Sequence, residues 1–196
     1  MANSEFHALL ELLSMPFSDP RTLVLFVLLV AAAVHDVRTY RIPNWLTGGG
    51  LAFALVYTAV VPPTYNASWT WAPAGMLLGF ATLLPLYLLR AMGAGDVKLM
   101  AMTGAFLGLQ GTVFALLFTF VAAGLAAFAY AAWHGVTRRM LGNTRQVLND
   151  LAVASIGGTR PALLLQPGQS VGRLAYGVSI AAGTIASVFA AQFGLI

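Results

Sequence analysis

Long runs of uncharged, apolar residues, separated by short polar segments, constrain the fold of this chain more than any other feature. Only 8% of its residues are charged, whereas soluble domains carry about 25%. In a bilayer, backbone polar groups can be satisfied only within helices or closed barrels, and uncharged runs of this length are typical of transmembrane helices. The pattern therefore predicts an all-α, polytopic integral membrane protein, with one membrane-embedded domain over residues 1–196.

Six runs are interpreted as transmembrane helices. Asn44, which follows Pro43, is a good N-cap for the second run, and Gln110-Gly111 is the predicted turn between the fourth run and the fifth. Glycines spaced four apart, at 75 and 79 and at 104 and 108, predict close helix packing. The six runs cover about residues 22–36, 45–61, 72–89, 99–109, 112–133 and 174–193.

The basic residues are spread along the chain, so the net charge of +4 indicates membrane topology and not a nucleic-acid surface. If the segment 36–44 faces the cytoplasm, every basic residue except Arg21 faces it too. The positive-inside rule then places both termini outside, in the periplasm, and puts Asp36 and Asp96 on the cytoplasmic side. The residues predicted inside are Arg38, Arg41, Arg90, Lys98, Arg138, Arg139, Arg145, Arg160 and Arg173.

Two segments outside the six runs have amphipathic patterns. Residues 1–20 carry apolar side chains at helical spacing, which predicts an interfacial N-terminal segment, although a frayed tail fits equally well. Residues 134–173 form the one long hydrophilic stretch and are predicted to be a cytoplasmic amphipathic segment. Membrane lipid is the expected neighbour of both, and the sequence does not say whether the second binds lipid or gates entry.

Beyond residue 20 the acidic residues are Asp36, Asp96 and Asp150. Between Arg21 and His35 lie only 13 residues, about 20 Å of helix against a hydrocarbon core of about 30 Å. We therefore expect Asp36 at or inside the membrane boundary, where water must reach it. The short fourth run predicts the same for Asp96, whereas Asp150 lies on the amphipathic stretch and is predicted to be a solvated surface charge.

Ionisable groups within membrane spans are costly and are usually functional. Two neighbouring carboxyl groups tend to share one proton, an arrangement suited to aspartic proteolysis, in which one takes a proton from water and the other protonates the scissile carbonyl. Gly93 and Gly95 permit positive φ and close approach of a substrate backbone beside Asp96. No metal or cofactor is expected, because the sequence has no cysteine, no HExxH motif and no histidines at metal-ligand spacing.

Three ordered motifs contain these aspartates or follow them. Asp36 precedes Arg41-Ile42-Pro43-Asn44, Gly93 to Lys98 read G-x-G-D-x-K, and Tyr176-Gly177-Val178 opens the last run. In this order they resemble the bacterial type IV prepilin leader peptidases, the GxGD aspartic membrane peptidases, in the short form that serves Flp or Tad pili. Ala175 departs from the family's usual proline before Tyr-Gly.

The resemblance implies a membrane aspartic endopeptidase. It would remove the short basic leader of type IV prepilins or pseudopilins at the cytoplasmic face of the bacterial inner membrane, cutting after a small residue ahead of the precursor's hydrophobic helix. Larger members also methylate the new N-terminus and carry a CxxC domain that this chain lacks, so no methyltransferase activity is expected. Asp36 and Asp96 take the catalytic positions. The residues that match supporting motif positions are Gly93, Gly95, Lys98, Arg41 and Asn44.

Two other classes of protein fit the apolar pattern and the two aspartates. A small proton-coupled transporter would also use membrane carboxyl groups, although the chain has no convincing inverted repeat. A non-catalytic component of a pilus assembly platform would fold in the same way. Only the peptidase predicts a cleaved product.

Overall fold

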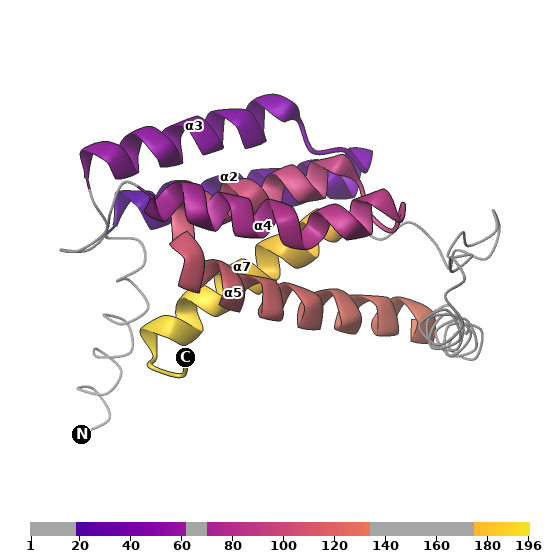
Figure 1. Ribbon diagram of the computed structural model, residues 1–196. Coiled ribbons are helices and arrows are strands. Elements are labelled where there is room, and N and C mark those ends of the chain that lie inside the picture. The colour runs from indigo at the N-terminus through magenta and orange to yellow at the C-terminus, as the bar shows by residue number, and fades with distance from the viewer. Residues whose placement is uncertain (1–18, 62–69, 134–174) are drawn as a thin grey trace, which may run out of the picture. The chain divides into compact units, whose positions relative to one another are not determined.

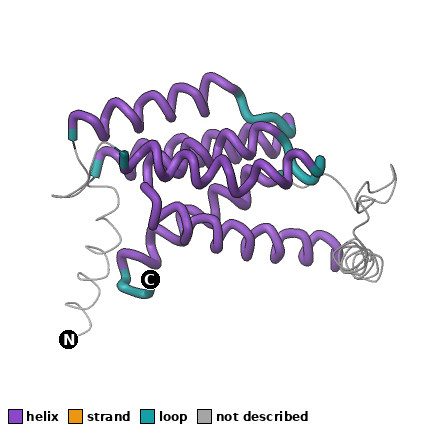
Figure 2. The backbone as a smooth tube through the Cα atoms, viewed as in Figure 1, coloured by secondary structure: helices purple, strands orange, loops and turns teal. Residues whose placement is uncertain are grey.

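The structure, a computed structural model, describes residues 19–61, 70–133 and 175–196, and the regular elements in these ranges are all helices (Figures 1 and 2). The all-α prediction is therefore confirmed for the part of the chain that the structure describes. By length and composition, three of these helices are able to cross a membrane: α2, α4 and α5. The helices are α2 (Pro20–Thr39), α3 (Asn44–Val60), α4 (Trp71–Leu88), α5 (Ala94–Trp133) and α7 (Tyr176–Gln192).

Four of the predicted runs coincide with α2, α3, α4 and α7, and the fourth and fifth runs correspond to the two helical parts of α5, which meet at a break at Gly108. The predicted turn at Gln110-Gly111 is wrong, because both residues are helical and the break lies at Gly108, with φ 69° and ψ −173°. Essentially only glycine adopts this backbone conformation. At the break, the carbonyl of Gly108 accepts a hydrogen bond from the hydroxyl of Thr112. Six separate spans remain a prediction.

The two ends of α2 determine where Asp36 lies. At the start, the side chain of Asp19 caps the helix by accepting from the Arg21 N–H at 3.2 Å, and Pro20 occupies the first helical position. At the end, Tyr40 adopts left-handed backbone angles, and its N–H donates to the Asp36 carbonyl at 2.8 Å. Asp36 therefore stands in the last turn of the helix.

The start of α3 differs from the expectation. Asn44 is the first helical residue and not the N-cap, which is Pro43, and α3 has no side-chain cap hydrogen bond. The N–H groups of Leu46 and Thr47 donate instead to the Pro43 carbonyl, at 3.2 and 3.4 Å. The prediction that Asn44 caps α3 is wrong because its side chain is used in a contact with α5.

The first half of α5 forms the centre of the helical core. Residues 99–106 are all buried, as expected for a helix that other helices surround. Glycines bring α4 into close contact with it: a Cβ atom at Gly75 would overlap the backbone of Gly104, and one at Gly79 would overlap the carbonyl of Met100. The predicted packing of small residues is thus confirmed. In the same core, α2 packs against both α3 and α7.

Arg21 joins three helices at the end of α2 that lies opposite Asp36. It is only 7% exposed, and its Nη2 donates to the Val61 carbonyl, just after α3, at 2.6 Å. Its guanidinium lies over the rings of Tyr57 and Trp71, 5.3 and 5.4 Å from their centroids. The start of α2, the end of α3 and the start of α4 therefore share one cationic anchor.

The chain divides into two compact units, residues 1–123 with 175–196 and residues 124–174. The described part of the second unit is the end of α5. The predicted segment at 134–173 lies outside the described residues, as does the segment at 1–20 except for its last two residues. A single membrane-embedded domain remains a prediction.

Substitution of Gly108 by alanine should destabilise the protein. A Cβ atom there would overlap the Trp71 indole, and the backbone angles disfavour any side chain. Backbone strain of about 1–3 kcal/mol predicts a thermal midpoint about 2–12 °C lower in detergent, at about 2–4 °C per kcal/mol for a chain of this size. Gly124→Ala is the control, because an added Cβ there meets no atom within 4 Å. Equal midpoints for both variants would contradict the expectation.

Candidate active site

Asp36 is buried at the contact between α2 and α7. It is 5% exposed, and its Oδ2 accepts a hydrogen bond from the Gly177 N–H at 2.8 Å. A Cβ atom at position 177 would lie only 2.8 Å from that same oxygen. The start of α7 can therefore approach the carboxyl group this closely only because residue 177 is glycine.

Asp96 lies in the first turn of α5 and is 7% exposed. Its Oδ2 accepts from the Gly93 N–H at 3.0 Å, and its own N–H donates to the Gly93 carbonyl at 3.2 Å. The first of these bonds is one half of a capping box, in which the side chain of the third helical residue accepts from the N–H of the residue before the helix. The start of α5 therefore fixes the orientation of this carboxyl group.

The structure brings the two carboxyl groups together. Asp36 and Asp96 lie close enough for their charges to interact, and the carboxyl group of Asp96 also interacts electrostatically with Tyr176. Gly177, which donates to Asp36, directly follows Tyr176. The first two residues of α7 thus approach one carboxyl group each, and the site is built from α2, α5 and α7.

Gly95 and Gly93 serve this site in a way that the sequence did not predict. Neither adopts positive φ, so that expectation is wrong; among the described glycines, positive φ occurs at Gly108 and Gly194. Gly95 lets the backbone pack closely against Ile42, because an added Cβ would lie 3.1 Å from the Cβ of Ile42. The contact packs the segment after α2 against the turn before Asp96.

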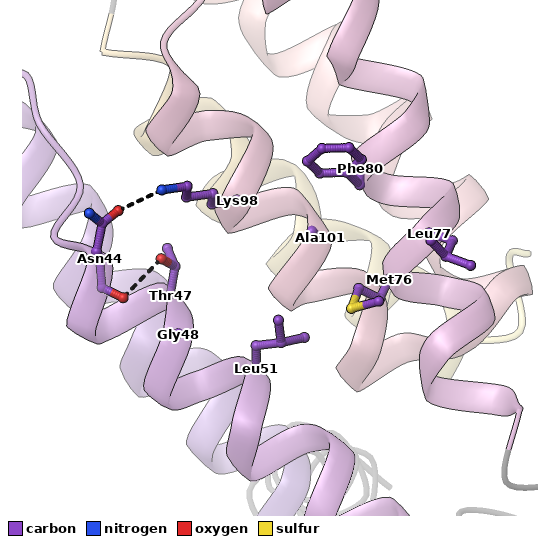
Figure 3. A pocket seen from close by; sticks show the side chains of 9 residues that line it. All are labelled: Asn44, Thr47, Gly48, Leu51, Met76, Leu77, Phe80, Lys98 and Ala101. Atoms are coloured by element: carbon purple, nitrogen blue, oxygen red, sulfur yellow. Dashed lines mark hydrogen bonds between the residues drawn. The ribbon is translucent and has the colours of Figure 1, made fainter.

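The remaining motif residues do not reach the pair of carboxyl groups. The Nζ of Lys98 donates to Asn44 Oδ1 at 2.9 Å, which links α5 to α3 (Figure 3). Lys98 follows Asp96 by two residues, about 200° around a helix, so the two side chains leave α5 on different sides. Arg41 is exposed, and its backbone carbonyl accepts from the Thr39 hydroxyl at 3.1 Å.

Sequence reasoning missed the roles of Tyr176 and Gly177. The motif at the start of the last run includes both residues, but the sequence pattern did not predict that they contact Asp36 and Asp96. Their separation from Asp36 is the reason, since the hydrogen bond from Gly177 spans 141 residues of sequence.

The described residues contain no group of three or more His, Cys, Asp or Glu side chains that could hold a metal ion. Two carboxyl groups that interact can position a water molecule and move its protons. The arrangement is thus suited to acid–base chemistry on a bond that enters between α2, α5 and α7.

Together these features define an all-helical membrane protein with two buried carboxyl groups at adjoining helix ends. The model of the type IV leader peptidase family matches residues 23–128, more than half of the chain, and this range contains both aspartates. The chain belongs to the type IV leader peptidase family and is therefore a peptidase. Searches of curated proteins and of solved structures found no match.

Replacement of Gly177 by alanine should lower peptidase activity more than it lowers stability. The methyl group would displace the Asp36 carboxyl group from the Gly177 N–H. Hydrogen bonds to charged groups contribute about 1.5–3 kcal/mol, so activity should fall at least about tenfold. Cleavage rates and thermal midpoints should be measured beside Gly49→Ala, where an added Cβ has no neighbour within 4 Å. Equal activity of the two variants would rule out a positioning role for Gly177.

Proposed function

We propose that this protein is an aspartic endopeptidase that removes the short basic leader of prepilins or pseudopilins at the cytoplasmic face of the bacterial inner membrane. One observation carries the proposal. In a member of the type IV leader peptidase family, the buried carboxyl groups of Asp36 and Asp96 interact with each other across two helix ends.

The proposed reaction needs one carboxylate and one protonated carboxyl group. The carboxylate takes a proton from a water molecule, whose oxygen attacks the carbonyl carbon of the scissile peptide, while the second carboxyl group protonates the carbonyl oxygen. A proton then passes to the peptide nitrogen, and the C–N bond breaks. The products are the carboxyl end of the leader and the free amino end of the mature protein.

Backbone donors orient both groups for this reaction. Gly177 and Gly93 each donate to an Oδ2 atom, of Asp36 and of Asp96 respectively. These bonds leave each Oδ1 atom for water and substrate. Because both donors belong to helix starts, the carboxyl groups are held in position before the substrate arrives, which is a main source of catalytic rate.

The cytoplasmic location rests on the distribution of charge. Arg38 and Lys98 lie near the same helix ends as the two aspartates, whereas Arg21 lies at the far end of α2. Cytoplasmic ends carry the excess of basic residues. We place the leader of the precursor in the cytoplasm and its hydrophobic helix in the bilayer. Six spans, periplasmic termini and the absence of methyltransferase activity belong to the same proposal.

Asp36→Asn and Asp96→Asn should each abolish leader removal. Amides keep the shape of the side chain but cannot take or give the proton, and general acid–base groups contribute about 10²–10⁴-fold. The measurement is co-expression with a type IV-like prepilin, read by gel shift and mass spectrometry. Asp19→Asn is the control, because Asp19 caps the other end of α2.

Unchanged cleavage by either variant would overturn the assignment of the catalytic pair. Failure of the wild type on a panel of prepilins, with the protein present in the membrane, would overturn the peptidase activity itself. The transporter or the platform component would then be the better explanation.

The rate of cleavage should depend on pH as a bell-shaped curve. Since the two carboxyl groups interact, catalysis requires one proton on the pair, and activity falls when the pair holds two protons or none. Single-turnover rates of the purified protein on a prepilin peptide, measured across pH, test this. A profile without an acidic limb would contradict a shared proton.

A further inference from the structure

A second feature lies on the other side of α5. A pocket of about 420 Å³ opens between α3, α4 and α5 (Figure 3). This volume lies within the range of small-molecule sites, about 300–1,000 Å³. Neither Asp36 nor Asp96 lines it, so the pocket is separate from the pair of carboxyl groups.

The pocket has one polar end and an apolar body. Asn44 and Lys98 form the polar end, and their hydrogen bond crosses from α3 to α5. Leu51, Met76 and Phe80 belong to the apolar body. Leu51 follows Asn44 by seven positions of α3, about 10 Å along a helix axis. The lining thus changes from polar to apolar along the direction of α3.

An exposed tryptophan indicates how deep the polar end lies in the membrane. Trp45, next to Asn44, is 72% exposed, and tryptophan side chains concentrate at the level of the lipid headgroups. With Trp45 at that level, Asn44 and Lys98 lie among the headgroups, and the apolar body lies at the level of the acyl chains.

The polar end is complementary to an anion. Lys98 is exposed, and it donates a hydrogen bond to the neutral amide oxygen of Asn44, so this contact does not neutralise the ammonium charge. Because Asn44 uses its oxygen for Lys98, its amide nitrogen keeps two N–H donors for a ligand. Phosphate oxygens are suitable partners for both groups.

We infer that the pocket between α3, α4 and α5 binds an anionic phospholipid, with the phosphate at Lys98 and Asn44 and an acyl chain along Leu51, Met76 and Phe80. The inference goes beyond the proposed peptidase function and does not depend on it. The lipid occupies the side of α5 that faces away from Asp96 and fills the space between α3 and α4.

Two adjacent glycines of α3 give a matched test. Gly48 lines the pocket and Gly49 does not. Both are exposed, and an added Cβ meets no atom within 4 Å at either position. Gly48→Leu therefore fills the pocket, whereas Gly49→Leu adds the same side chain to the same helix outside it. Lys98→Gln removes the charge alone.

The experiment measures lipid binding to the full chain purified in a neutral detergent. Native mass spectrometry and thermal midpoints should be recorded with phosphatidylglycerol and with phosphatidylcholine that carry the same acyl chains. The wild type and Gly49→Leu should retain phosphatidylglycerol and gain stability from it. Gly48→Leu should bind it about tenfold more weakly. Lys98→Gln should lose the preference for phosphatidylglycerol but keep the weaker binding common to both lipids.

Three results would overturn the inference: equal lipid binding by Gly48→Leu and Gly49→Leu, no preference of the wild type for the anionic lipid, or an unchanged preference in Lys98→Gln. A fourth would assign the pocket to the precursor instead. In that case lipid binding is unchanged in Gly48→Leu, but photo-crosslinking of a prepilin's hydrophobic helix to α3 is lost. None of these readouts requires cleavage, so failure of the peptidase proposal would remain distinguishable.

Discussion

The hydrogen bond between Gly177 and Asp36 is the constraint on which the site depends. A carboxyl group at a membrane helix end needs a donor, since an unsatisfied polar group in a low-dielectric environment costs several kcal/mol. Here the donor is a backbone N–H that comes from the other end of the chain. That contact joins the start of α7 to the last turn of α2, and the preceding residue, Tyr176, lies near Asp96. The packing of α7 against α2 and the hydrogen bond of one buried acid therefore meet at the same helix ends.

Much of the helical framework could be predicted from the sequence because the bilayer imposes simple rules. Uncharged runs predicted the helices α2, α3, α4 and α7 and the two parts of α5, and the positive-inside rule put Asp36 and Asp96 on one side before any site was considered. The glycines of α4 and α5 were correctly assigned to close packing, since spacing by four aligns small residues on one helix face. In each case the pattern was local in the sequence.

The errors occurred where a distant residue decides between local alternatives. Glycine stands at both 108 and 111, and the overlap that a side chain at 108 would have with Trp71 is visible only in the packed structure. Asn44 is a preferred capping residue, but Lys98 uses its side chain from 54 residues away. Likewise, glycine is required at 95 and 177 because Ile42 and Asp36 pack closely against these positions, and not because of the backbone angles there. A local sequence motif does not reveal such contacts.

The two ends of α3 are held by different kinds of contact. Its guanidinium fixes the end of α3 to the starts of α2 and α4, whereas Asn44, at the other end of α3, is joined to α5 through an exposed side-chain hydrogen bond. A helix of 17 residues is about 25 Å long, so a tilt of about 10° around the anchored end moves the other end by about 4 Å. A tilt about the end held by Arg21 would therefore displace the start of α3 most, where Asn44 meets Lys98 of α5.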